Sequence, residues 1–127
     1  MDSHELVDSI GMDVLIAVGT KMGLTEEWLR KLVDPHSKSV PWSHGSFLKY
    51  FMYTMGGGAT PCCPEHADHS LLTVSLCSQV PELAVLDRLT GKWIMVEENA
   101  DELDIIVFPG YYLSMLTCGY LHAPLHR

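Results

Sequence analysis

From Ser70 onward the sequence is a series of short apolar runs separated by turn-forming residues. The run from Ser70 to Cys77 has the two-residue alternation of a strand, with Leu72, Val74 and Leu76 on one side. Further runs at 83–86, 93–96, 103–108 and 120–126 are separated by turns such as Leu89-Thr90-Gly91-Lys92 and Pro109-Gly110. Strands this short and closely spaced are typical of a sandwich, a barrel or a jelly roll. We therefore predict a mainly β fold, preferably a jelly roll, and not a parallel α/β sheet.

Two amphipathic helices are predicted ahead of this β region. Apolar residues recur at helical spacing between Leu6 and Met22, and Gly23 is suited to end that helix. Thr25 is a candidate N-cap for a second helix, which Asp34-Pro35 would end. We expect residues 1–45 to form a helical segment and a loop, and residues 46–127 to form the β domain, with its first strand at 47–53.

The composition argues against several classes of partner. The chain of 127 residues has a net charge of -8 and no cluster of lysines and arginines, which argues against binding to nucleic acid or anionic lipid. Its apolar runs are too short to span a bilayer, and the acidic N-terminus is unlike a secretory signal peptide. Four irregularly spaced cysteines indicate reduced thiols. We expect a cytoplasmic protein that acts on a small molecule.

His66-Ala67-Asp68 is the segment with the clearest chemistry. In extended backbone, residues two apart project to the same side, so His66 and Asp68 offer an imidazole and a carboxylate together. His126 would add a second imidazole if the fold brought both segments to the mouth of a jelly roll. Two histidines and one carboxylate form the facial triad of mononuclear non-haem Fe(II) sites. We predict an iron site formed by these three residues.

Neighbouring residues offer a different metal site. Cys62, Cys63, His66 and His69 supply the thiolates and imidazoles of tetrahedral zinc. Adjacent cysteines fit poorly, because structural zinc motifs separate their paired ligands by two to four residues. His122 would share a strand face with His126, and we expect it to be a solvated neighbour.

The order of these motifs resembles that of the isopenicillin-N-synthase-like group of Fe(II)/2-oxoglutarate-dependent dioxygenases. The segment His66-Ala67-Asp68-His69-Ser70-Leu71-Leu72-Thr73 is similar to the His-Thr-Asp-x-Gly-Leu-Leu-Thr of that group. Other similar pieces follow the same order along nearly the whole chain: Gly23-Leu24-Thr25-Glu26-Glu27-Trp28, Met52-Tyr53, Pro81-Glu82-Leu83-Ala84-Val85-Leu86-Asp87, Gly91-Lys92-Trp93, Leu116-Thr117-Cys118-Gly119 and Leu125-His126-Arg127.

The resemblance implies a double-stranded β-helix, which is the jelly roll predicted from the strand pattern. It implies that His66, Asp68 and His126 hold Fe(II), that 2-oxoglutarate is a co-substrate, and that Tyr53 contacts it. Enzymes of this kind use dioxygen to convert 2-oxoglutarate to succinate and carbon dioxide while they oxidise a small organic substrate. Ascorbate is a candidate accessory cofactor.

The sequence departs from the pattern of that group in two ways. The Arg-x-Ser pair that anchors 2-oxoglutarate about ten residues beyond the second histidine has no counterpart in a sequence ending at Arg127. Tyr111 stands where an Asp usually follows the Gly. We therefore expect a truncated member whose β-helix is incomplete at the C-terminus and whose His126 strand is unpaired. The alternative to an enzyme is a catalytically inactive remnant of the fold that acts as a metal-binding or interaction module.

Overall fold

The computed structural model describes residues 3–33, 64–78, 80–101 and 103–127. The chain divides into two compact units, residues 1–49 and 50–127, which are described separately. The predicted domain boundary at residue 45, the predicted strand at 47–53, and the residues Tyr53, Cys62 and Cys63 lie outside the described residues.

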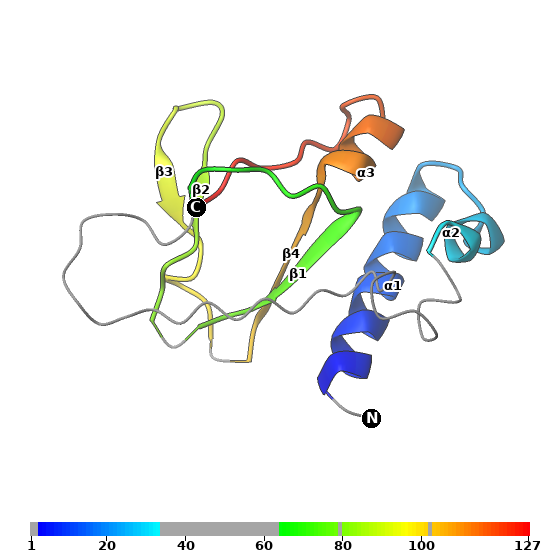
Figure 1. Cartoon of the computed structure of the whole chain (residues 1–127), viewed down its shortest axis with the longest axis horizontal. Coiled ribbons are helices and arrows are strands. Elements are labelled where there is room, and N and C mark those ends of the chain that lie inside the picture. Colours follow the sequence, from blue (N-terminus) through cyan, green and yellow to red (C-terminus); the bar gives the residue numbers. More distant parts are fainter. Residues whose placement is uncertain (1–2, 34–63, 79, 102) are drawn as a thin grey trace. The chain divides into compact units, whose positions relative to one another are not determined.

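The first unit contains helices α1 (Ser3–Lys21) and α2 (Glu26–Leu32) (Figure 1). After α1, Gly23 adopts a φ of 84°, and Leu24 N–H donates to the carbonyl of Gly19 over 3.0 Å. This is a Schellman turn, whose left-handed position favours glycine because residues with a Cβ rarely adopt a positive φ. Thr25 Oγ1 accepts the N–H of Trp28 at 3.2 Å and so caps α2. Both predicted helices, the Gly23 stop and the Thr25 cap are confirmed.

The helices of this first unit pack through a small apolar core. Leu15 of α1 is 3% exposed and Leu29 of α2 is 1% exposed, and the two helices contact each other. On the outer face of α2, Arg30 and Lys31 pair with carboxylates one turn earlier. Among the described residues, no helix combines the length and the apolar character needed to cross a bilayer.

The second unit contains two antiparallel strand pairs (Figure 1). β1 (Leu72–Leu76) pairs with β4 (Ile105–Pro109), with Thr73 opposite Phe108. β2 (Ala84–Leu86) pairs with β3 (Trp93–Met95) across the predicted turn. Short antiparallel strands that follow N-terminal helices in the sequence agree with the predicted class. Strands overlap four of the predicted runs, and β4 extends one residue beyond its run. The double-stranded β-helix stays a prediction.

A third helix, α3 (Tyr111–Leu116), follows β4 and was not predicted. Its N-cap residue is Gly110, directly after Pro109 ends β4, and Gly110 provides no side-chain cap. The sequence therefore lacks the polar start signal by which a helix is usually recognised. Leu113 of α3 is buried, as are Phe108 of β4 and Ala84 of β2.

The predicted last strand at 120–126 is wrong for most of its length. Of these residues, only His126 takes part in β bridges, one with His66 and one with Val85. Proline has no backbone N–H, so Pro124 cannot donate a hydrogen bond to a strand ladder.

The expectation that the segment around His126 is unpaired is also wrong. Arg127 N–H donates to the carbonyl of Ala84 at 3.0 Å, and Ala84 N–H donates to the carbonyl of Arg127 at 3.1 Å. Leu86 N–H donates to the carbonyl of Leu125 at 2.9 Å. Residues 125–127 therefore lie between β2 and the segment that carries His66. His126 is buried there, with 6% of its surface exposed.

Candidate metal centre

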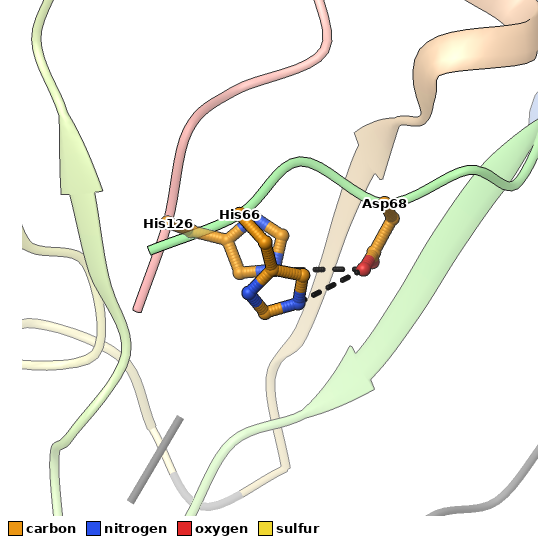
Figure 2. Close-up of side chains that lie close together, drawn as sticks. All are labelled: His66, Asp68 and His126. Carbon is orange, nitrogen blue, oxygen red and sulfur yellow. Dashed lines mark ion pairs between the residues drawn. The ribbon is translucent and has the colours of Figure 1, made fainter. Parts of the chain in front are cut away.

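His66, Asp68 and His126 lie together in the second unit, as predicted. The Nε2 atom of His66 is 3.3 Å from Oδ1 of Asp68, and the Nε2 atom of His126 is 3.7 Å from the same oxygen. One ligand atom from each of the three residues lies within 4.8 Å of the other two. In Figure 2 the two imidazoles overlap in the view, with their planes tilted by 53°, and the Asp68 carboxylate points toward both.

The backbone fixes how the two histidines meet. His66 N–H donates to the carbonyl of His126 at 3.0 Å, and His126 N–H donates back at 2.9 Å. Residues that exchange both hydrogen bonds are direct antiparallel partners, so their side chains project to the same face. The ring centroids are accordingly 4.4 Å apart. This pairing brings together two ligands that are distant in the sequence.

Both imidazoles are oriented by the carbonyl group two residues before them. Nδ1 of His66 lies 2.9 Å from the carbonyl oxygen of Pro64, and Nδ1 of His126 lies 3.1 Å from that of Pro124. A carbonyl oxygen can only accept, so Nδ1 carries the hydrogen in each ring. In the neutral imidazole, the lone pair is then on Nε2. Both lone pairs belong to the atoms nearest Asp68, which is the arrangement that a metal ligand requires.

The segment that carries Asp68 is held against the start of α3. Tyr111 N–H donates to the carbonyl of Asp68 at 2.6 Å, Tyr112 N–H donates to Ser70 at 3.2 Å, and Gly110 N–H donates to Leu71 at 2.9 Å. A Cβ at Gly110 would collide with the carbonyl and hydroxyl oxygens of Ser70. Glycine at this position therefore permits the close approach that fixes the backbone at Asp68.

The cluster is buried on one side and accessible on the other. The side chain of His126 is 8% exposed, and its ring lies 5.0 Å from the ring of Phe108. The side chains of Asp68 and His66 are 26% and 41% exposed. Access to the cluster is therefore from the side of His66 and Asp68.

The donor set fits a ferrous ion. Two imidazole nitrogens and one carboxylate oxygen are the ligands of the non-haem Fe(II) facial triad. Ligand atoms about 2.1 Å from an octahedral ion lie about 3 Å apart on one face. The two contacts to Asp68 Oδ1, at 3.3 Å and 3.7 Å, are close to that spacing.

A family model described as the 2OG-Fe(II) oxygenase superfamily matches residues 42–127. This span is more than half of the chain and contains His66, Asp68 and His126. The chain belongs to the 2OG-Fe(II) oxygenase superfamily. Comparison with curated proteins and with solved structures gives no match.

Two further histidines, His69 and His122, lie outside the cluster of this 2OG-Fe(II) oxygenase chain. His69 is exposed, and its ring packs edge-on against Tyr111, 6.1 Å away, outside the cluster. His122 is exposed, as expected. The suggested zinc ligands Cys62 and Cys63, and the predicted co-substrate contact Tyr53, lie outside the described residues.

Four supporting features of the candidate metal centre were missed by the sequence reasoning. They are the Thr73 hydroxyl, the Phe108 ring, the missing Cβ of Gly110 and the two carbonyls that orient the histidines. The last of these has a sequence signal, because Pro64-Glu65-His66 and Pro124-Leu125-His126 repeat the pattern Pro-x-His.

Proposed function

We propose that this chain is an Fe(II)/2-oxoglutarate-dependent dioxygenase domain that oxidises a small organic substrate while 2-oxoglutarate is converted to succinate and carbon dioxide. The observation that supports this most strongly is the convergence of His66, Asp68 and His126 in a chain of this superfamily. The finer proposals of an isopenicillin-N-synthase-like relationship and a double-stranded β-helix are supported by the order of motifs in the sequence.

In this proposal each ligand residue contributes one donor atom. His66 and His126 bind through Nε2, because their Nδ1–H groups are already donated to the carbonyls of Pro64 and Pro124. Asp68 binds through Oδ1 and offsets part of the positive charge of the ion. A ferrous ion held on this face would supply the positions at which 2-oxoglutarate and dioxygen bind and react. Tyr53 remains the predicted contact to 2-oxoglutarate.

The test is succinate release from 2-oxoglutarate in the presence of Fe(II), ascorbate and air. The full chain is compared with His66→Ala and Asp68→Ala, and with His122→Ala as a matched control, because His122 is an exposed histidine four positions before His126. We expect the full chain and His122→Ala to release succinate and the two ligand variants to lose this activity. Equal release by all four chains would contradict the proposal.

Measuring metal binding in parallel distinguishes an active enzyme from a catalytically inactive remnant of the fold. A remnant that acts only as a metal-binding module would bind Fe(II) under nitrogen, lose that binding in Asp68→Ala, and release no succinate. Binding and release together would favour the enzyme.

A further inference from the structure

The hydroxyl groups of Ser70 and Thr73 form a chain of hydrogen bonds that ends at Oδ2 of Asp68. Thr73 Oγ1 donates a hydrogen bond to Asp68 Oδ2, and Ser70 Oγ lies 3.1 Å from Thr73 Oγ1. A threonine hydroxyl has a single hydrogen, and an ionised carboxylate only accepts. Since Thr73 uses its hydrogen on Asp68, Ser70 must be the donor to Thr73. The hydrogen bonds therefore run from Ser70 through Thr73 to Asp68.

This series gives the two oxygens of Asp68 different environments. Oδ1 is the atom near both histidine Nε2 atoms, whereas Oδ2 accepts the hydrogen bond from Thr73. Thr73 lies within β1 and is paired with Phe108 of β4, so its position is fixed by a strand ladder. The hydroxyl is therefore presented to Asp68 from a regular element and not from a loop.

We propose that Thr73, supported by Ser70, is a positioning residue that holds Asp68 as a metal ligand through Oδ1 alone. This inference rests on the proposed function, since it requires a metal ion at the cluster. A carboxylate whose second oxygen is free can rotate or bind a metal through both oxygens. Binding through both would occupy a coordination position that the facial arrangement leaves open. Hydrogen bonds to ligating carboxylates fix the ligand orientation in this way.

The experiment measures Co(II) binding to the full chain under metal-buffered conditions, with Co(II) as an air-stable probe for the ferrous site. Thr73→Val replaces the hydroxyl by a methyl group and keeps a β-branched residue in the strand. We expect its dissociation constant for Co(II) to rise about 10-fold to 100-fold, the usual effect of losing such a partner. Thr73→Ser restores the hydroxyl, and we expect its dissociation constant to return to within about threefold of the wild-type value.

A spectroscopic readout separates positioning from general loss of structure. The visible absorption of bound Co(II) depends on the number and arrangement of its ligands. We expect the spectrum of Thr73→Val to differ from that of the wild-type chain, because Asp68 is free to bind through both oxygens. The spectrum of Thr73→Ser should match that of the wild-type chain.

The matched control is Thr90→Val. Thr90 Oγ1 also donates to an aspartate, Asp87 Oδ2, at 2.5 Å, but it does so in the turn between β2 and β3. This variant removes the same kind of hydrogen bond outside the cluster, and we expect it to bind Co(II) like the wild-type chain. Ser70→Ala removes only the first donor of the series, and we expect a smaller loss of affinity than in Thr73→Val.

Failure of this inference differs from failure of the proposed function. If the wild-type chain binds no Co(II), or if Asp68→Ala binds it equally well, the metal site itself is refuted. If Asp68→Ala abolishes binding while Thr73→Val binds as tightly as the wild-type chain, only the positioning role is refuted. Should circular dichroism show that Thr73→Val does not fold, Ser70→Ala decides: weaker binding supports the role, and unchanged binding overturns it.

Discussion

Thr73 and Phe108 are direct partners across the β1–β4 pair, and each contacts a different residue of the candidate metal centre. Thr73 donates to the carboxylate of Asp68, and the Phe108 ring lies 5.0 Å from the ring of His126. Directly opposed residues of an antiparallel pair project to the same face of the sheet. One cross-strand pair therefore contacts two of the three candidate ligands, Asp68 and His126. The third ligand, His66, is positioned by its backbone pairing with His126.

His126→Ala and His66→Ala should differ in stability although both remove a ligand. His126 is 8% exposed and contacts Phe108, so its truncation should lower the free energy of unfolding of the metal-free protein by about 1–3 kcal/mol. His66 is 41% exposed, and we expect a loss below about 1 kcal/mol. Urea denaturation with a chelator present measures both values, and Co(II) binding should be lost in each variant. Equal destabilisation by the two substitutions would contradict the structural difference between them.

Gly110→Ala should damage both the fold and the candidate metal centre. The added methyl group would meet the carbonyl and hydroxyl oxygens of Ser70, so the backbone around Asp68 must move away from α3. We expect a loss of about 1–3 kcal/mol in the free energy of unfolding, together with weaker Co(II) binding.

Gly91→Ala provides the comparison for that glycine variant. Gly91 has a φ of 68° in the turn between β2 and β3, and an added Cβ meets nothing within 4 Å. Alanine there should cost about 1 kcal/mol through backbone strain alone. Its Co(II) affinity should equal that of the wild-type chain, and a matching loss of affinity in both variants would argue against a specific role for Gly110.

The sequence predicts those parts of this molecule that depend on neighbouring residues. Helices α1 and α2, the Gly23 stop and the Thr25 cap follow from local spacing and local hydrogen bonds. Strand β1 follows from two-residue alternation, and β2, β3 and β4 follow from short apolar runs bounded by turn residues. The cluster of His66, Asp68 and His126 follows from its ligand types and the family resemblance. These are the features that a linear pattern can encode.

The features that the sequence did not predict depend on distant partners. Gly110 supplies no cap, so the start of α3 is defined by N–H groups that reach Asp68, Ser70 and Leu71 on another segment. His126 is paired because β2 and His66 lie on its two sides, and neither neighbour is visible in the residues around it. Nothing in the residues next to Thr73 distinguishes it from other strand threonines, and its role follows only from the hydrogen bond to Asp68 in the folded chain.

Arg127→Gln should destabilise the second unit more than Glu65→Gln. The Arg127 guanidinium lies 4.3 Å from the centre of the Trp93 ring and 3.5 Å from a Glu65 carboxylate oxygen. Loss of the ring contact should cost about 0.5–1 kcal/mol. Glu65→Gln removes only the half-exposed ion pair and should lower the free energy of unfolding by less, because solvent screens that pair. Thermal unfolding in low and high salt measures both effects, with Arg88→Gln, in the exposed turn after β2, as the control. A larger effect for Glu65→Gln would show that the ion pair dominates.

Glu97 is a buried carboxylate that organises the chain ahead of β2. Its Oε1 accepts Ser78 N–H at 3.0 Å, and its Oε2 accepts Glu82 N–H at 2.8 Å and Leu83 N–H at 3.0 Å. Burial by itself would raise the pKa of Glu97, but the hydrogen bonds from Leu83, Glu82 and Ser78 outweigh it and hold the pKa below the ordinary value of 4.5. β2 in turn pairs with residues 125–127, so Glu97 also supports the segment that carries His126.

The lowered pKa of Glu97 predicts a specific loss of stability in acid. The unfolded chain takes up the proton at higher pH than the folded protein, so the stabilisation is complete above pH 4.5 and is lost as the pH falls through the folded pKa. Glu97→Gln leaves one acceptor and turns an amide donor toward N–H groups, which should cost about 1–3 kcal/mol at pH 7. Its stability should then depend less on pH below 4.5 than that of the wild-type chain. Denaturation with a chelator at several pH values, with the exposed neighbour variant Glu98→Gln as control, measures this difference. Parallel pH profiles for wild-type and Glu97→Gln chains would show that another carboxylate governs the acid response.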